Sequence, residues 1–283
     1  MKFSERMGIE SQKQIQTDDI DQTLRNRILN YIVRVDQWSA KFILDRLGMR
    51  TSETFSNKKK DMNFYNLKGY MTKCPWYKIY EIFEYYLIYN HDNYPEHSPA
   101  WETNRKKRNE FTDNINRILE EERSGYRIVN GIVAPLTNPV EIDSIEQSMF
   151  TVYPSVNTHF HKALELYSKR PEPDYENTIK ESISAVEAMC SIIVGKDTTL
   201  GKALNQLEKQ GIVIHEALKD AYSKLYGYTS DEKGIRHAGI EFSDAPHEDA
   251  KYMLVVCSAF VNYLTEKFDK SKENRCLVKE STS

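Results

Sequence analysis

Apolar residues recur three and four positions apart over most of this chain of 283 residues. Such spacing places side chains on one face of an α-helix, whereas a half-buried strand alternates apolar and polar residues. The pattern is clearest in residues 179–193 and 253–264, and it also appears in residues 79–87. The sequence therefore predicts an all-α protein.

Capping signals give the approximate helix boundaries. Gly48, Gly195 and Gly211 follow three of the periodic segments, where a glycine in the left-handed conformation commonly ends a helix. The polar stretch 51–61, which contains Lys58, Lys59 and Lys60, is predicted to be a loop. The predicted helices are residues 21–47, 76–89, 101–122, 157–168, 175–194, 199–209, 214–226 and 247–268.

One short segment departs from the helical pattern. The dipeptide Asn130-Gly131 lies between apolar residues and favours the positive φ angles of a two-residue hairpin turn, so we predict a small β-hairpin near residues 126–136. A chain of this length has room for two domains, and the hairpin marks the boundary between them. The predicted organisation is two helical modules, residues 1–140 and 141–275, followed by a flexible tail at residues 276–283.

The composition excludes several classes of protein. Charged residues make up 29% of the chain and hydrophobic residues 40%, which is typical of a folded globular protein. No apolar run is long enough to cross a membrane and the N-terminus has no signal-peptide core, so we expect a cytoplasmic protein without a membrane partner. The net charge of -3 gives no general attraction to nucleic acid, so RNA binding would need a local patch.

Metal and cofactor chemistry has little support in the sequence. Cys74, Cys190, Cys257 and Cys276 form no C-x-x-C pair, so we interpret them as free thiols. His159 and His161 should face different sides of a helix, and no Cys, Asp or Glu close to them in the sequence completes a metal site. The phosphate-loop, serine-hydrolase and zinc-protease motifs are absent, and we expect no cofactor.

The run Arg105 to Arg108 is a second basic cluster besides the three lysines of the predicted loop. Four consecutive residues wrap around a helix and do not form one stripe. We therefore interpret this cluster as a solvated surface and not as a nucleic-acid reader.

Two sets of short motifs resemble known families. Residues 3–8 and 21–26 are similar to the N-terminal domain of AbiJ-type abortive-infection proteins. Residues 180–188, 199–204, 225–231 and 234–238 together resemble the HEPN-like module that follows such a domain. The two resemblances cover most of the chain, and the second implies that the C-terminal module is a HEPN-like helical bundle.

The HEPN resemblance implies a homodimer in which paired Arg and His residues cut RNA without a metal ion. A histidine suits proton transfer at the ribose 2′-hydroxyl, and an arginine stabilises the charge that builds on phosphate. On this basis the expected catalytic residues are Arg236, His237 and His247, and the expected substrate-binding residues are Lys202 and Lys233.

This sequence departs from the pattern of active HEPN nucleases, in which four to six residues separate Arg from His. No arginine of the chain has a histidine at that spacing. Between Asp231 and Lys251, six acidic residues stand against three basic ones, so Arg236 has a second interpretation as the ion-pair partner of a carboxylate. A second copy of the chain across a twofold axis is one way to supply the missing group.

Two hypotheses follow. The first is a homodimeric effector of abortive infection that cleaves RNA during phage infection. The second is a non-catalytic HEPN-like module that binds RNA or a partner protein of a defence system and works by assembly.

Overall fold

The computed structural model describes residues 7, 14–32, 37–52, 57–92, 100–169, 172–196, 200–230 and 245–280. In residues 37, 38, 57–61, 92, 228–230 and 273–280 it describes the backbone alone. The chain divides into two compact units, an N-terminal unit (Met1–Thr137) and a C-terminal unit (Asn138–Ser283). Apart from one two-stranded hairpin, the regular structure of the described residues is helical, which confirms the predicted fold class.

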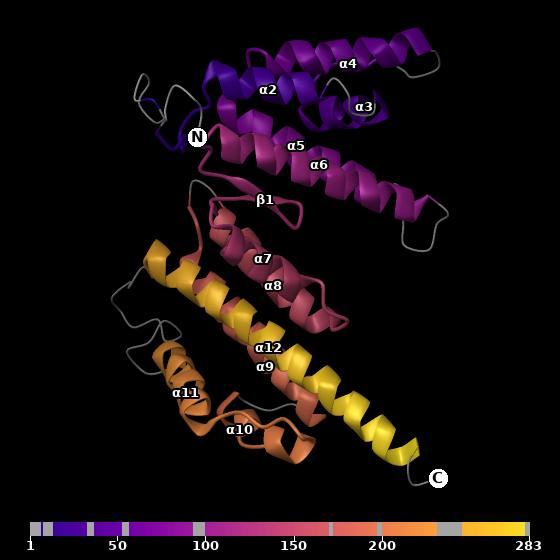
Figure 1. Ribbon diagram of the computed structural model, residues 1–283. Coiled ribbons are helices and arrows are strands. Elements are labelled where there is room, and N and C mark those ends of the chain that lie inside the picture. The colour runs from indigo at the N-terminus through magenta and orange to yellow at the C-terminus, as the bar shows by residue number, and fades with distance from the viewer. Residues whose placement is uncertain are drawn as a thin grey trace. The chain divides into compact units, whose positions relative to one another are not determined.

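The N-terminal unit packs its helices around an apolar and aromatic core. Helix α3 contacts both α4 and α5, while α6 contacts α2 and α5. Leu24, Ile79, Phe83 and Ile115 are fully buried in this core. The helices of the unit, drawn in indigo to magenta in Figure 1, are α2 (Gln22–Ile32), α3 (Gln37–Arg46), α4 (Asn57–Met71), α5 (Trp76–Asp92) and α6 (Trp101–Glu121).

The predicted hairpin is present as β1 (Arg127–Val129) and β2 (Ile132–Ala134). Asn130 and Gly131 have φ angles of 45° and 84°, as a two-residue turn of this kind requires. The side chain of Asn116 in α6 bonds both backbone groups of Ile128, at 2.7 and 2.8 Å, which docks the hairpin on α6.

A segment before α2 is held to the end of α6. The backbone of Gln16 donates to Arg123 O at 2.9 Å and accepts from Gly125 N at 2.8 Å. Gly125 allows this close approach, because a Cβ atom there would lie 2.9 Å from Cγ2 of Thr17. Glu122, only 1% exposed, accepts from Arg27 at 2.8 Å in the same region.

The C-terminal unit is a helical bundle centred on α9. This helix contacts both α8 and α12, and α7 contacts α8 and α12. Figure 1 shows the long helix α12 lying along α9, with α10 and α11 beside α9. The elements are α7 (Pro139–Met149), α8 (Pro154–Ser168), α9 (Tyr175–Val194), α10 (Leu200–Leu204), a short 3-10 helix (Leu207–Gln210), α11 (Glu216–Ser230) and α12 (His247–Glu280).

Local signals explain why α9 has the bounds that its sequence predicts. Asp174 is the N-cap, and its side chain accepts a hydrogen bond from the backbone N–H of Asn177 at 3.0 Å. Gly195 follows the last turn with a φ of 78°, the left-handed conformation in which glycine ends a helix at little cost. Between these caps the apolar face of α9 is buried.

Several predicted boundaries need correction. Helix α4 was not predicted. It begins at Asn57, so the backbone of Lys58 to Lys60 is helical and not a loop; lysine is a good helix former, and polar composition alone does not distinguish a helical turn from a loop. The predicted helix 21–47 corresponds to two helices, α2 and α3, and the residues between them lie outside the described part of the chain. The predicted helix 199–209 is split into α10 and the 3-10 helix.

The two ends of the C-terminal unit also differ from the sequence prediction. Helix α7 was not predicted, although Asn138 caps it and Pro139 occupies its first turn. Helix α12 extends to Glu280, beyond the predicted end at residue 268 and into the predicted tail 276–283. Charged residues that favour helices continue the last turns after the buried stripe ends.

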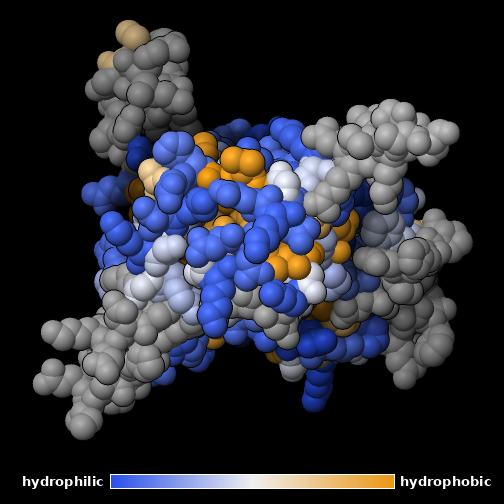
Figure 2. All heavy atoms as spheres, turned by 90° about the horizontal axis from the view of Figure 1, so that it is seen from below, coloured by the Kyte–Doolittle hydropathy of each residue, from blue (hydrophilic) through white to orange (hydrophobic). Residues whose placement is uncertain are grey.

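The surface seen in Figure 2 is mostly hydrophilic, with hydrophobic areas between the polar side chains. The exposed apolar side chains of the C-terminal unit include Phe150, Val152, Val213 and Leu218. None of the described helices combines the length and hydrophobicity that a membrane crossing requires.

Candidate functional site

The residues expected to form the active site are only partly described. Arg236, His237 and Lys233 lie outside the described residues. Lys202 is exposed on the short helix α10. His247 begins α12 and is half-buried.

His247 is fixed by two tyrosines. Its Nε2 atom lies 2.7 Å from the hydroxyl oxygen of Tyr167, which is fully buried. The ring of Tyr167 stacks on the imidazole with centroids 5.4 Å apart, and Tyr175 meets the imidazole edge-on at 5.6 Å. The Nε2 atom of His247 is therefore engaged by the protein itself.

A second histidine has a different environment. The Nδ1 atom of His159 in α8 lies 2.6 Å from Oε2 of Glu181 in α9, and the two side chains are 31% and 26% exposed. A carboxylate at Nδ1 favours the tautomer with its proton on that nitrogen, which leaves Nε2 as an acceptor. The neighbouring His161 instead lies near Glu165 of its own helix, at 3.4 Å on the surface.

His159 also lines an open groove of about 650 Å³ along α8 and α9. Its walls on α9 come from residues at spacings of three and four, which share one helix face. Small side chains at several of these positions leave the surface recessed. The lining residues are Ser155, His159, Ser184, Glu187, Ala188, Ser191, Ile192, Gly195 and Lys196.

The pairing of His159 with Glu181 was not predicted, because the two residues are 22 positions apart in the sequence. A usable signal was present. A connection of a few residues makes α8 and α9 antiparallel neighbours, so residues at similar distances from it lie side by side. Glu181 is within one helical turn of the α9 residue that lies as far from the connection as His159 does.

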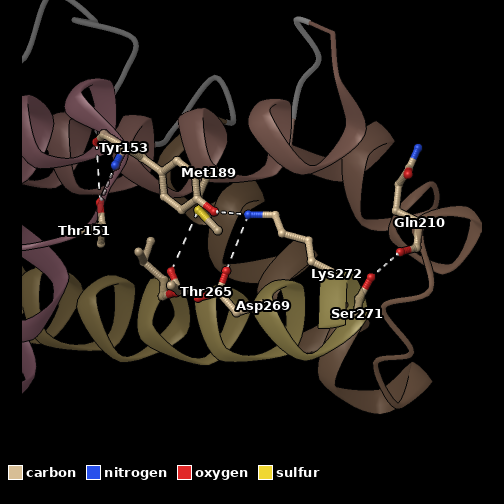
Figure 3. Close-up of polar contacts among 9 residues, drawn as sticks. Thr151, Tyr153, Met189, Gln210, Thr265, Asp269, Ser271 and Lys272 are labelled. Atoms are coloured by element: carbon tan, nitrogen blue, oxygen red, sulfur yellow. Dashed lines mark hydrogen bonds and ion pairs between the residues drawn. The ribbon is translucent and has the colours of Figure 1, made fainter. Parts of the chain in front are cut away.

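The second half of α12 is anchored by polar contacts, shown in Figure 3. The ammonium group of Lys272 donates to the hydroxyl of Tyr153 at 3.0 Å and lies 4.1 Å from the centre of the Phe268 ring. The hydrogen bond to Tyr153 raises the pKa of Lys272. The hydroxyl of Ser271 donates to Gln210 O at 3.0 Å, which joins α12 to the 3-10 helix.

The described residues include no candidate reactive cysteine and no candidate metal site. Cys74, Cys190 and Cys257 are buried and form no disulfide. Burial raises the pKa of Cys190 and of Cys257 to about 12, so neither is a reactive thiolate at neutral pH. No group of three potential metal-binding His, Cys, Asp or Glu side chains occurs in the described part of the chain.

Comparison with known proteins gave one match. A family model described as AbiJ N-terminal domain 4 matches residues 1–151, which is more than half of the chain. No curated protein and no solved structure matches the sequence.

Proposed function

Because the chain belongs to the family described as AbiJ N-terminal domain 4, we propose that it is an abortive-infection protein of bacterial anti-phage defence. In this proposal the C-terminal unit is a HEPN-like bundle that pairs with a second copy and cuts RNA without a metal ion. The match supports the AbiJ-type assignment of the N-terminal module. The HEPN-like assignment rests on the motif resemblance.

The observation that carries the nuclease proposal is the placement of His247. The imidazole is held by Tyr167 and Tyr175 at the first turn of α12. In the sequence, Arg236 and His237 come shortly before this turn. A fixed imidazole that follows a permanently charged guanidinium closely in the sequence supplies the two types of group that metal-free RNA cleavage uses.

A specific observation also favours the second candidate, a non-catalytic module that binds RNA or a partner protein. The spacing of Arg and His in active HEPN nucleases is absent, and Nε2 of His247 already contacts the hydroxyl of Tyr167. An imidazole whose Nε2 atom is already bonded inside the protein contributes to packing and is less available for proton transfer.

Incubation of the purified full chain with total RNA and EDTA separates the two candidates. The nuclease proposal expects cleavage that survives the chelator and is lost in both Arg236→Ala and His237→Ala. Cells that express either variant should then grow normally. Toxicity that persists in the variants without RNA cleavage would favour the assembly module.

The proposed homodimer has its own measurement. Light scattering should give twice the chain mass of 33.1 kDa at micromolar concentration. A monomer under these conditions would contradict a site shared between two copies.

A further inference from the structure

Helix α4 lies at the edge of the N-terminal unit, where Figure 1 shows it beside α3. Its inner side carries Asn63, Leu67 and Met71, which are buried. Among the described elements, α3 is the one with which α4 shares an extensive contact. The opposite side of α4 is left exposed to solvent.

This exposed side carries an apolar stripe. Met62 is 53% exposed and Tyr65 is 67% exposed. Met62, Tyr65 and Gly69 follow one another at spacings of three and four, so they lie in one line along the helix. Apolar side chains at these spacings are the anchors with which one amphipathic helix binds another protein surface. We call Met62, Tyr65, Asn66 and Gly69 the outer face of α4.

The packing of the N-terminal unit does not require the glycine in this face. Gly69 lies inside a helix, where glycine is less stable than alanine. A Cβ atom at Gly69 would meet no heavy atom within 4 Å outside the adjacent backbone, and its φ angle is not positive. A glycine does allow a second helix to approach closely, because the distance between packed helices depends on the side chains at the contact. Gly69 therefore favours a helix as the partner.

The charge around the outer face indicates the sign of the partner. Residues 57–73 contain five lysines, one acidic residue and no arginine. Lys68 and Lys73 are exposed, and no ion pair of either occurs among the described side chains. Unpaired ammonium groups beside an apolar stripe are complementary to a helix with carboxylates along its apolar side. A nucleic acid fits less well, since phosphate recognition favours arginine and since Met62 and Gly69 contribute nothing to it.

We infer that the outer face of α4 binds an acidic amphipathic helix of a partner protein, whose carboxylates lie toward Lys68 and Lys73. Tyr65 is the central anchor, because a large rigid ring supplies contact area and loses little conformational entropy on binding. This inference goes beyond the proposed cleavage of RNA. The site belongs to the N-terminal unit and uses no residue of the C-terminal unit.

A synthetic peptide tests the inference on the full chain. The probe is a peptide of about 20 residues, long enough to form a helix, with alanine and leucine on one face and glutamate on the other. In a chain with isotope-labelled methionine methyl groups, the peptide should shift the resonance of Met62 until the site is saturated. The resonance of Met7, which is comparably exposed at 59%, should not move. The same peptide with lysine in place of glutamate should not bind.

Gly69→Ala separates binding from folding. Alanine favours the helix and meets nothing in the unit, so the unfolding midpoint of the N-terminal unit should rise by about 2–5 °C. The added methyl group should nevertheless weaken binding of the peptide about tenfold, because it holds the two helices apart. Gly227→Ala in α11, where an added Cβ atom also meets nothing, is the control and should leave the affinity unchanged.

Tyr65→Ala tests the proposed anchor. Loss of the ring should weaken binding of the peptide at least about tenfold, as expected for an aromatic residue at the centre of an interface. Tyr252→Ala removes a ring that is 57% exposed on α12 and should leave the affinity unchanged. Equal losses in the two variants would contradict a site on α4.

Four results would overturn the inference. No shift of Met62, or an equal shift of Met62 and Met7, would show that the outer face does not bind an acidic helix. A shift with oligothymidine and not with the peptide would assign the face to nucleic acid. A shift that grows with the concentration of the chain alone would assign it to a second copy. Unchanged affinity in Gly69→Ala would exclude close packing of two helices. Because the probe is not RNA, these results are independent of the nuclease proposal.

Discussion

The N-terminal and C-terminal units bury different kinds of polar groups. The N-terminal unit buries charged and amide side chains, among them Arg25, Arg127, Glu122 and Asn63. The described part of the C-terminal unit buries no charged or amide side chain, and its buried polar residues are four serines and one threonine. The first unit therefore depends on specific polar contacts, and the second depends mainly on apolar packing.

The hydrogen-bond partners of these buried polar side chains also differ between the two units. Nη1 of Arg25 donates to Met71 O, 46 positions away, at 2.8 Å. In the C-terminal unit the hydroxyl of Ser182 donates to Thr178 O, one turn back in α9, at 2.7 Å. A hydroxyl bonded within its own helix contributes little to the choice of fold, whereas a long-range bond joins two elements.

The largest effects should come from the two cores. Phe83 and Phe160 are fully buried, one in each unit. Replacement of either by Ala should cost about 3–5 kcal/mol of unfolding free energy, because the lost contacts and the cavity add. In calorimetry, Phe83→Ala should lower the transition of the N-terminal unit and Phe160→Ala that of the C-terminal unit. An equal shift of both transitions by either variant would contradict separate cores.

Substitution of the buried polar side chains should change the unfolding free energy less than the core substitutions do, and by different amounts in the two units. Arg25→Met keeps much of the apolar stem but leaves the carbonyl of Met71 without its charged donor, so it should cost about 2–3 kcal/mol. Ser182→Ala should change stability by less than about 0.5 kcal/mol, since the helix keeps its backbone bonds. Urea unfolding of the two variants measures this. Equal costs would remove the proposed distinction between the units.

The C-terminal unit should lose stability in alkali through its buried thiols. The pKa of Cys257 is about 12 in the folded chain, raised from 9.0 by burial. The unfolded thiol therefore loses its proton first, so this contribution is fully present below pH 9 and falls as the pH rises toward 12. At pH 10 the loss is about 1 kcal/mol per thiol. Under reducing conditions, Cys257→Ala should lose less stability than wild type between pH 8 and 10.

The smallest effect concerns the anchor of α12. Lys272→Met keeps the stem but removes the ammonium group that bonds Tyr153 and lies above Phe268, which should cost about 0.5 kcal/mol at this exposed site. Lys270→Met, on an exposed position of the same helix, is the control and should have no effect. Thermal unfolding of the two variants gives the comparison. A larger loss in the control would show that charge in general, and not the local contacts of Lys272, matters.

Sequence patterns predicted the elements whose signals are local. The bounds of α9 follow from Asp174, Gly195 and the apolar period between them. The hairpin turn follows from Asn130-Gly131. Helix α4 was not predicted, because the polar residues at its start are also typical of a loop. Helix α7 was missed although Asn138 and Pro139 mark its start.

The candidate site was harder to predict, because its contacts join residues from different helices. His159 and Glu181 meet only when α8 and α9 are packed against each other. The contact of His247 with Tyr167 spans 80 positions, and no local pattern indicates it. The expected roles of Arg236, His237 and Lys233 remain predictions, since these residues lie outside the described part.

Helix α11 is held weakly by the bundle. None of its residues 216–227 is buried, and its closest ring contact is the stacking of Tyr222 on Phe260, with centroids 3.4 Å apart. Backbone amides in an element with so few covered side chains exchange with solvent through small local openings. Detachment of α11 therefore leaves the contacts of α9 with α8 and α12 in place. A local opening of α11 would thus cost much less free energy than the unfolding of α9.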